Sequence, residues 1–518
     1  MSSKKVRFVA LLASMAVLVT GVGATWAALP AQAQSAGVAP AKAQTAAAKY
    51  HSLSAYLAQD VTWKQCATDT YCGVVQVPQD WNNLKGPAIE LSVDFHRASV
   101  AKPLGSVIFN PGGPGASGYD YLLNSTDGIT TAKLLKNYNL VGFDPRGVQH
   151  SAPVKCYSNA ALDDFIYGDT GYPLGSAKDI AGTKAGLRKF AASCAKRTGK
   201  LLGLVDTISA AKDLNVIRAV MGDAKLNYLG FSYGTFLGNT YAALFPKQVG
   251  RMVLDGAIDP SVPQSVQSLN QLKGFDLALR DYLKDCLNQS GCPFTGSVAA
   301  AQSKISAFLK GLETKPITSS DHNRKVSVWM ALNGIYMALY SNDYWGYLTT
   351  AFKQAFKGDG TTLQRLADFY NDRNPDGTYN SNQTEANMAI NCLDGRESAN
   401  WSDILAQNKR MLAASPVFGR YWQFGGLACF GWKYPVVKPL PSYAAKGSPT
   451  ILVVGTTNDP ATPYAQAQWL AHKVLANGVL VTYQGEGHTA YGRNDCVNAA
   501  VDAFFINGAV PAADPMCK

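Results

Sequence analysis

Short apolar stretches alternate with amphipathic ones over residues 73–254. The apolar stretches have the length of buried strands and lie at 73–78, 89–95, 106–110, 139–144, 225–229 and 251–254. The segment before the strand at 225–229 has apolar residues at helical spacing on one face: Ala210, Leu214, Ile217 and Met221. Strands that alternate with helices indicate a mostly parallel sheet with helices on both faces. We therefore expect an α/β fold.

The alternation stops after about residue 264 and resumes late in the chain. Residues 265–440 are mainly helical in composition, with many aromatic residues and several loops rich in Gly, Asn and Asp. A strand at 449–455, a helix at 463–476 and a strand at 478–483 then follow. A helical segment therefore interrupts the sheet before its last two strands. We predict three parts: a first part of the core at 49–264, a helical cap at 265–440 and a last part of the core at 441–518.

The first residues have the pattern of a secretion signal. A basic start is followed by an apolar run over 8–24 and by the small-x-small sequence Ala31-Gln32-Ala33. We predict a signal peptide at 1–33 and a secreted, extracellular protein without stable membrane association once the signal is removed. An uncleaved membrane anchor is the alternative, but the run is short for a spanning helix. Residues 34–48 are predicted to be a flexible leader or pro-segment.

The 10 cysteines all follow the predicted signal. An even number of cysteines in an exported chain favours disulfides, although sequence alone does not fix their connectivity. The chain has no C-x-x-C and no H-E-x-x-H sequence, so neither a metal site nor a redox site is expected. Neighbours in the sequence form the pairs that we hypothesise: Cys66 with Cys72, Cys156 with Cys194, Cys286 with Cys292, Cys392 with Cys429, and Cys496 with Cys517.

The formal net charge of +11 does not indicate nucleic-acid binding. Lys and Arg are scattered along the chain, and they form no basic run with interleaved aromatic residues. We interpret them as a solvated basic surface and expect no nucleic-acid partner. The pattern contains no indication of the oligomeric state.

The sequence Gly230-Phe-Ser232-Tyr-Gly234 fits the G-x-S-x-G motif. The motif needs small residues two positions before and two positions after the serine, because the chain turns there sharply from a strand into a helix. A predicted strand precedes this motif, and 235–244 has the pattern of a helix. We predict that Ser232 is a nucleophile, with an ordinary strand–helix turn as the alternative.

A serine nucleophile needs a base, and His488 is the strongest of the six histidines. His488 lies just after the last predicted strand, where parallel sheets build their sites. His150 also follows a strand, but it precedes the serine in the chain. Asp459 follows the penultimate strand and gives the order Ser, Asp, His. Its rival as the acid that orients the base is Asp255, just after an earlier strand.

Two backbone N–H groups are needed to bind the oxyanion that develops in acyl transfer. We predict that they belong to Tyr233, next to the nucleophile, and to Gly113 in the glycine-rich loop 110–115. The same loop begins a G-x-G-x-x-G sequence at 113–118, with Asp144 at a later strand end, which is the pattern of a dinucleotide site. Pro114 disfavours that alternative because it removes a backbone donor, so no cofactor is expected.

These motifs together resemble the secreted bacterial tripeptidyl aminopeptidases, which belong with the proline iminopeptidase-like α/β-hydrolases. The resemblance runs from about residue 60 to the C-terminus. The stretches that carry it are 110–115 (NPGGPG), 144–147 (DPRG), 230–234 (GFSYG), 458–463 (NDPATP) and 487–490 (GHTA).

The resemblance implies an α/β-hydrolase fold and a serine exopeptidase. Such an enzyme releases short peptides, typically tripeptides, from free peptide or protein N-termini through an acyl-enzyme. It also implies a cap with an acidic side chain that binds the substrate's α-ammonium group. Asp394 is our candidate for this role, a structural role for it is the alternative, and Glu397 and Glu385 remain open. A carboxylesterase or other acyl hydrolase with the same three residues is the alternative function.

Overall fold

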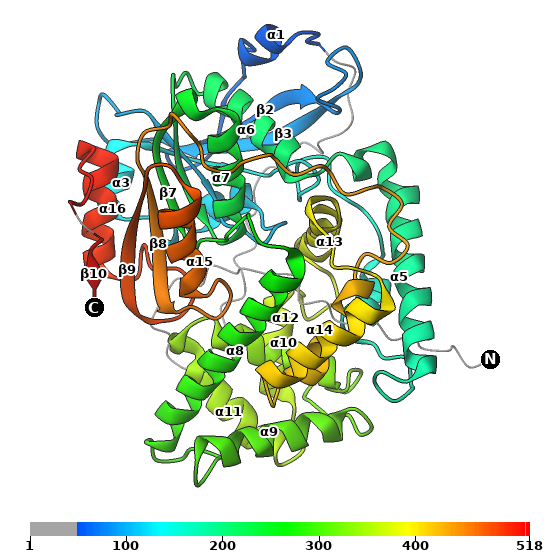
Figure 1. Cartoon of the computed structure of the whole chain (residues 1–518). Coiled ribbons are helices and arrows are strands. Elements are labelled where there is room, and N and C mark those ends of the chain that lie inside the picture. The colour runs from blue at the N-terminus through cyan, green and yellow to red at the C-terminus, as the bar shows by residue number, and fades with distance from the viewer. Residues whose placement is uncertain (1–48, 513) are drawn as a thin grey trace.

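A mixed sheet runs through the centre of the protein (Figure 1). The computed structural model describes residues 49–512 and 514–518. The predicted signal peptide (1–33) and leader (34–48) therefore lie outside the described residues. The predicted α/β-hydrolase fold is confirmed by the arrangement of strands and helices in the described part of the chain.

The strands of the sheet lie in the order β1-β2-β3-β5-β4-β6-β7-β8-β9-β10. The first neighbours are antiparallel up to the pairing of β3 with β5, and the pairs from β5 to β10 are parallel. Their bounds are β1 Lys64–Ala67, β2 Thr70–Pro78, β3 Ala88–His96, β4 Ser106–Asn110, β5 Asn139–Phe143, β6 Leu226–Phe231, β7 Val249–Asp255, β8 Ile451–Asn458, β9 Gly478–Glu486 and β10 Met516–Cys517.

The parallel strands are buried on both faces, which explains their continuous apolar sequences. Successive side chains of a strand point to opposite faces of the sheet. On β6, Tyr228 belongs to the larger hydrophobic cluster on one face, while Leu229 belongs to the smaller cluster on the other. Leu214 of α6 (Thr207–Val220) and Leu237 of α7 (Tyr233–Leu244) also belong to the first cluster. Phe504 of α16 (Asp495–Asn507) belongs to the second. The sheet is thus the middle layer of three.

Helices flank this sheet on both faces (Figure 1). The predicted helix at 463–476 is α15 followed by one π-helical turn at Leu470–Val474. The core helices are α1 Leu53–Leu57, α2 Gly118–Asn124, α3 Ala132–Asn137, α4 Asn159–Tyr167, α5 Ala177–Thr198, α6 Thr207–Val220, α7 Tyr233–Leu244, α15 Tyr464–Trp469 and α16 Asp495–Asn507.

A layer of helices lies on one side of the sheet (Figure 1). In the sequence, these helices come between β7 and β8. They are α8 Gln264–Leu287, α9 Val298–Leu312, α10 Val328–Leu339, α11 Trp345–Ala355, α12 Thr361–Tyr370, α13 Gln383–Asp394 and α14 Trp401–Ala414. We refer to this layer as the cap. Its exact limits at 265 and 440 stay a prediction.

The cap also contacts α4, which precedes it by many residues in the chain. The hydroxyl of Tyr167 donates to the carbonyl oxygen of Ala367 at 3.1 Å, and Ser327 donates to the carbonyl of Tyr167 at 2.9 Å. Arg373 forms two hydrogen bonds with the carboxylate of Asp163, at 2.7 and 2.8 Å. Part of the cap's support therefore comes from the segment between β5 and α6.

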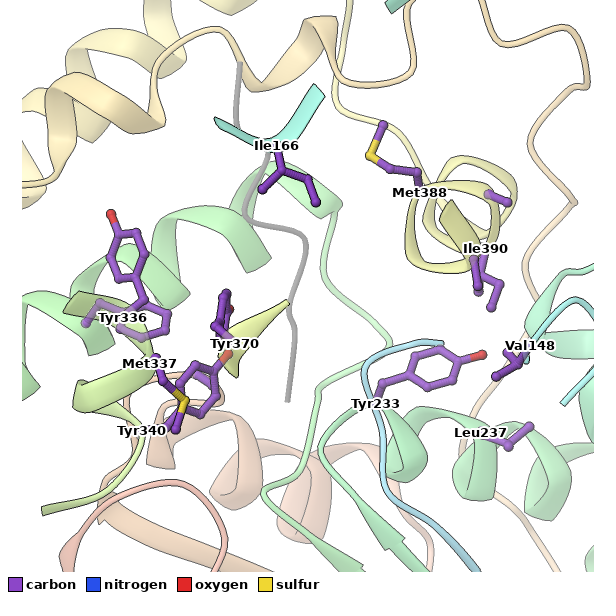
Figure 2. Close-up of a cluster of buried hydrophobic side chains, with 14 of the residues drawn as sticks. Val148, Ile166, Tyr233, Leu237, Tyr336, Met337, Tyr340, Tyr370, Met388 and Ile390 are labelled. Carbon is purple, nitrogen blue, oxygen red and sulfur yellow. The ribbon is translucent and has the colours of Figure 1, made fainter. Parts of the chain in front are cut away.

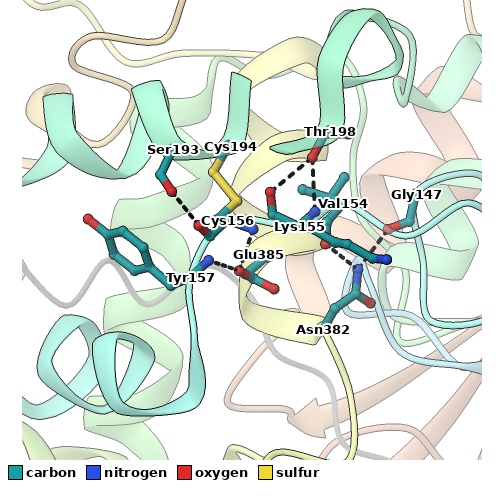
Figure 3. The surroundings of a disulfide bond; sticks show 10 residues. All are labelled: Gly147, Val154, Lys155, Cys156, Tyr157, Ser193, Cys194, Thr198, Asn382 and Glu385. Atoms are coloured by element: carbon teal, nitrogen blue, oxygen red, sulfur yellow. Dashed lines mark hydrogen bonds between the residues drawn. A yellow bond between two sulfur atoms is a disulfide. The ribbon is translucent and has the colours of Figure 1, made fainter. Parts of the chain in front are cut away.

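Five disulfides link the described cysteines, and they are the neighbouring pairs hypothesised from the sequence. Cys156–Cys194 joins the segment after β5 to α5 (Figure 3). Cys392–Cys429 joins the end of α13 to the segment that returns to the core. Within the described residues, no helix combines the length and the apolar character that a bilayer span requires.

Arg146, in the DPRG sequence, forms a fully buried ion pair with Asp213 of α6. The guanidinium donates to both carboxylate oxygens, at 2.6 and 2.7 Å, and the indole of Trp81 donates to the same carboxylate at 2.9 Å. The guanidinium also donates to three backbone carbonyls, those of Pro78, Gln79 and Leu204. All five of its N–H donors are therefore used.

The buried pair predicts a large loss of stability when one partner is removed. Arg146→Ala leaves the carboxylate of Asp213 buried without its counter-ion, so the free energy of unfolding should fall by about 3–5 kcal/mol. Urea denaturation of the variant and the wild type measures the difference. Lys284→Ala removes a pair with Asp281 in which the lysine side chain is 63% exposed, and should change the free energy by less than about 1 kcal/mol. Equal effects of the two substitutions would contradict the expectation.

Candidate active site

Ser232 lies at a sharp turn between β6 and α7. Its backbone has φ 54° and ψ −121°, a conformation that costs a residue with a side chain about 1–3 kcal/mol. A Cβ at position 230 would lie 2.4 Å from the carbonyl oxygen of Gly234, and one at position 234 would lie 2.6 Å from that of Asn110. Only glycine fits at either position, because the backbone comes this close. Ser232 therefore lies in the turn itself, between the end of β6 and the start of α7.

His488 and Asp459 form a buried pair after the last two parallel strands. Nδ1 of His488 lies 2.8 Å from each carboxylate oxygen of Asp459. The side chain of His488 is 3% exposed and that of Asp459 is 0% exposed. A hydrogen on Nδ1 bound to the carboxylate leaves Nε2 free to accept a proton. This is the arrangement that the sequence predicted for the base and its orienting acid.

Further donors surround the carboxylate of Asp459. The N–H groups of Ala461 and Thr462 donate to Oδ1, at 2.9 and 2.8 Å, and the hydroxyl of Thr462 donates to Oδ2 at 3.0 Å. That hydroxyl also lies 3.3 Å from Nδ1 of His488. The sequence reasoning missed Thr462. An aspartate often accepts from the backbone N–H two residues later in a turn, so the turn after Asp459 could have been expected, but nothing indicated the role of the Thr462 hydroxyl.

Asp255, the rival acid, binds the backbone of the histidine loop instead of the imidazole. Its carboxylate accepts from the N–H groups of Ala490, at 3.0 Å, and Tyr491, at 2.8 Å. Burial raises the pKa of Asp255 to about 6, against the opposing effect of these two N–H groups. Asp255 therefore supports the loop that carries His488.

Ser232 and His488 both contact the chain at the end of β7, where residues 255 and 256 lie. The N–H of Ser232 donates to the carbonyl oxygen of Asp255 at 2.9 Å. On the next residue, a Cβ at Gly256 would lie 3.1 Å from Cε1 of His488. Neither Oγ of Ser232 nor Nε2 of His488 has a hydrogen-bond partner within the described ranges, and both atoms are buried. The backbone of Ser232 and the ring of His488 thus both lie against residues 255–256, and neither Oγ nor Nε2 is held by a hydrogen bond from the described residues, as is common before substrate binds.

His150, the other histidine that follows a strand, has a different partner: its Nε2 lies 2.8 Å from Asp120. Of these two histidines, His488 is the one whose ring lies against Gly256, next to the residue whose carbonyl accepts from the N–H of Ser232.

The glycine-rich loop after β4 packs against the turn at Ser232. A Cβ at Gly112 would lie 3.0 Å from Cβ of Ser232 and 3.2 Å from the backbone nitrogen of Tyr233. The next residue, Gly113, has φ 107°. On the other side, a Cβ at Gly115 would lie 2.9 Å from the carbonyl oxygen of Gln383 in the cap. The loop therefore lies between the turn and the cap.

Asp394 ends α13, and it is linked to the residue after Ser232. Its two carboxylate oxygens accept from the backbone N–H and the hydroxyl of Thr207, at 2.9 and 2.5 Å. The hydroxyl of Thr207 in turn accepts from the hydroxyl of Tyr233. Burial raises the pKa of Asp394 to about 7, although the two bonds from Thr207 oppose the shift. A chain of hydrogen bonds thus joins the cap to the side chain of Tyr233.

The other two acidic candidates have more peripheral partners. Glu385 accepts from the N–H groups of Cys156 and Tyr157, both at 2.7 Å, and so fixes α13 to the disulfide-linked segment (Figure 3). Glu397 accepts from the hydroxyl of Ser268 at 2.6 Å. Glu385 is 7% exposed and uses its charge on backbone groups, so it is poorly available to a ligand.

Apolar and aromatic side chains of the cap face the turn at Ser232. Figure 2 shows Met388 and Ile390 of α13 above the ring of Tyr233, with Tyr340 and Tyr370 on the opposite side of the view. All five side chains are less than one-tenth exposed. The ring of Tyr340 meets that of His488 edge to face, with centroids 5.6 Å apart. The cap thus supplies an apolar environment for Ser232 and His488.

The fold, the turn at Ser232 and the Asp459–His488 pair define a serine hydrolase of the α/β-hydrolase fold. The family model described as TAP-like protein matches residues 415–517. Three comparisons with known proteins cover most of the chain. The sequence is 34% identical to serine protease Hip1 of Mycobacterium tuberculosis, over 89% of this chain and 91% of that protein. It is 30% identical to tripeptidyl aminopeptidase of Streptomyces lividans, over 88% and 86%.

The third relative is carboxylesterase B of Mycobacterium tuberculosis, which is 36% identical over 86% of both chains. The chain belongs to the TAP-like α/β-hydrolase family that includes these three proteins. The resemblance to tripeptidyl aminopeptidases that the sequence motifs indicated is thereby confirmed.

The raised pKa of Asp255 predicts how stability depends on pH. Because the folded state binds this proton more tightly than the unfolded state, the stability that it contributes is full below about pH 4 and is lost as the pH rises through about 6. Asp255→Asn removes this titration. The free energy of unfolding of the variant, relative to the wild type, should therefore rise by up to about 3 kcal/mol between about pH 4 and about pH 7.

Urea denaturation at both pH values measures this difference. Asp60→Asn, which changes an exposed carboxyl, is the control and should follow the wild type at both pH values. Parallel profiles for the wild type and Asp255→Asn would show that the carboxyl of Asp255 does not titrate in this range.

Proposed function

We propose that this chain is an exported serine exopeptidase that releases short peptides, tripeptides in the main, from the free N-termini of peptides or proteins. The observation that carries the proposal is the buried pair of His488 and Asp459, at 2.8 Å, beside the strained turn that presents Ser232. The names of two relatives, a serine protease and a tripeptidyl aminopeptidase, support peptide substrates.

In the proposed reaction, Oγ of Ser232 attacks the scissile carbonyl carbon while Nε2 of His488 takes the hydroxyl proton. The negative charge that develops on the carbonyl oxygen is bound by the N–H groups of Tyr233 and Gly113. Collapse of the intermediate breaks the C–N bond, and His488 gives its proton to the departing amine. Asp459 orients the imidazole and stabilises the imidazolium.

The same residues then hydrolyse the acyl-enzyme. His488 takes a proton from a water molecule as the water oxygen attacks the acyl carbon. Collapse of the resulting intermediate breaks the bond between the acyl carbon and Oγ of Ser232, and His488 returns the proton to Oγ. Each cycle releases one short peptide with a new carboxylate and leaves the enzyme unchanged. No cofactor takes part in the proposed cycle.

A carboxylesterase is the second candidate function. The relative named carboxylesterase B is 36% identical to this chain, which favours this alternative. The deciding experiment compares a free tripeptide amide with its N-acetylated form. We expect the exopeptidase to lose activity when the amine is blocked, whereas an esterase would be indifferent. Mass spectrometry of products from a mixed peptide library gives the length of the released peptide, and products from chain interiors would contradict the proposal.

The exported state of the protein is part of the proposal. Five disulfides among the described residues are typical of an oxidising compartment. Mass determination of the protein from the culture medium would test the predicted cleavage after Ala33, and intact protein retained with the cells would contradict it.

The three proposed catalytic residues predict large losses of turnover. Ser232→Ala and His488→Ala should each lower kcat by about 10⁴–10⁶-fold, and Asp459→Asn by about 10⁴-fold, because each removes a group that acts in the transition state. Hydrolysis of the tripeptide amide measures these effects, with circular dichroism to verify folding. His150→Ala changes the other histidine that follows a strand and should keep wild-type kcat. A comparable loss of kcat in His150→Ala would contradict the assignment of His488 as the base.

A role of Asp394 in binding the substrate's ammonium group predicts a particular pH dependence. Only the carboxylate attracts the ammonium group, and the pKa of Asp394 is raised to about 7. The kcat/KM for the free tripeptide amide, divided by that for a small ester without an amine, should therefore fall as the pH is lowered from about 7.5 to about 5.5. The division cancels the titration of the base, which both substrates share.

Asp394→Asn should give a low ratio at every pH. Glu397→Gln is the matched control, since it neutralises the neighbouring candidate and should keep the wild-type profile. If Asp394→Asn keeps its preference for the free amine, Asp394 has only the structural role that its bonds to Thr207 support.

A further inference from the structure

The loop that carries His488 is attached to the cap through the backbone. The N–H of His488 donates to the carbonyl oxygen of Tyr340 at 2.8 Å. Tyr340 directly follows α10 and is 2% exposed, and its ring packs edge to face on the imidazole. The position of His488 therefore depends on a cap residue as well as on Asp459.

Arg493 makes a second connection between the same two segments. Its Nη1 donates to the carbonyl oxygens of His488 and Thr489, at 3.3 and 3.4 Å. Its Nη2 donates to Oγ of Ser341 at 3.1 Å and to Oδ1 of Asn342 at 3.3 Å. The guanidinium is thus a bridge, with the histidine loop on one side and the cap segment 340–343 on the other.

The bridge is closely packed and only weakly paired with acids. The side chain of Arg493 is 14% exposed, and a carboxylate oxygen of Asp343 lies 3.9 Å from its Nη2. A Cβ at Gly487 would lie 2.6 Å from Nη1, so the guanidinium lies directly against the backbone before His488. Its main contacts are neutral acceptors, which suits a group that orients a backbone.

We propose that Arg493 is a positioning residue that couples docking of the cap segment 340–343 to the position of His488. This inference rests on the proposed role of His488 as the base. A planar guanidinium donates in fixed directions to both segments at once, which the single ammonium of lysine does not reproduce. Nε2 of His488 has no hydrogen-bond partner among the described residues that would hold it in place. The proposed proton transfer needs Nε2 to reach Oγ of Ser232, so a small displacement of the loop changes its rate.

The test measures acylation and turnover per active site with a small ester that makes few contacts with the cap. We expect Arg493→Ala to lower kcat and the rate of labelling by a fluorophosphonate probe by about 10–100-fold. KM for the ester should change little, since the substituted residue does not touch it. Arg493→Lys should give an intermediate rate. Added guanidinium chloride, far below denaturing concentrations, should partly restore Arg493→Ala, while ammonium chloride should not.

The cap side is tested with the double variant Ser341→Ala/Asn342→Ala. It should lower kcat to a similar extent, and combining it with Arg493→Ala should cause little further loss, because both remove the same bridge. Arg420→Ala is the matched control: it removes a cap guanidinium that pairs with Glu313, and should leave ester turnover unchanged.

Three results would overturn the inference in different ways. Full labelling and turnover in Arg493→Ala, with His488→Ala inactive, would remove the role of Arg493 and leave the proposed function intact. Loss in Arg493→Ala with wild-type turnover in the cap variant would remove the coupling to the cap. High activity in His488→Ala would refute the proposed base, and with it the inference.

Discussion

The backbone at Ser232 is held in a strained conformation by close contacts on both sides. Gly230 and Gly234 leave no space for a Cβ, and Gly112 brings the loop after β4 within contact of the turn. These contacts compensate for a φ of 54° that an ordinary serine avoids. The same contacts place the backbone nitrogen of Tyr233 beside the glycine-rich loop. Presentation of the Ser232 hydroxyl and formation of the proposed oxyanion site therefore depend on one packing arrangement.

Buried carboxyl groups carry much of the support around this turn. Asp459 faces the imidazole, Asp255 binds the loop that follows it, and Asp394 connects the cap to Tyr233 through Thr207. Each accepts from at least two donors, which offsets the loss of hydration. The cap is therefore joined to the core by polar contacts as well as by its apolar face, and both kinds of contact meet close to Ser232.

The sequence predicted the parts that depend on local pattern. The strands at 106–110 and 139–143 are continuous apolar runs buried on both faces, and they were predicted to within a residue. Short β1 and β10 were missed, because exposed Lys64 and Met516 give no alternation to detect. His488 could be chosen because strand order fixes which loops share an edge of the sheet.

Other parts of the candidate site arise only when distant segments meet. Thr207, Tyr340 and Arg493 lie in unrelated stretches of the chain, and no local spacing distinguishes them from ordinary core residues. The sequence predicts either a ligand-binding or a structural role for Asp394, but it does not reveal that both carboxylate oxygens accept hydrogen bonds from Thr207. Contacts of this kind depend on how the cap packs on the sheet.

The disulfide between Cys392 and Cys429 has a practical consequence for redesign of the enzyme. Cys392 lies two residues before Asp394, and Cys429 lies on the return path from the cap to β8. The covalent link makes the end of α13 and this return segment a single mechanical unit. Loop grafts between related enzymes should therefore exchange both segments together. A chimaera that takes the end of α13 and the return segment from different enzymes would be strained near Asp394.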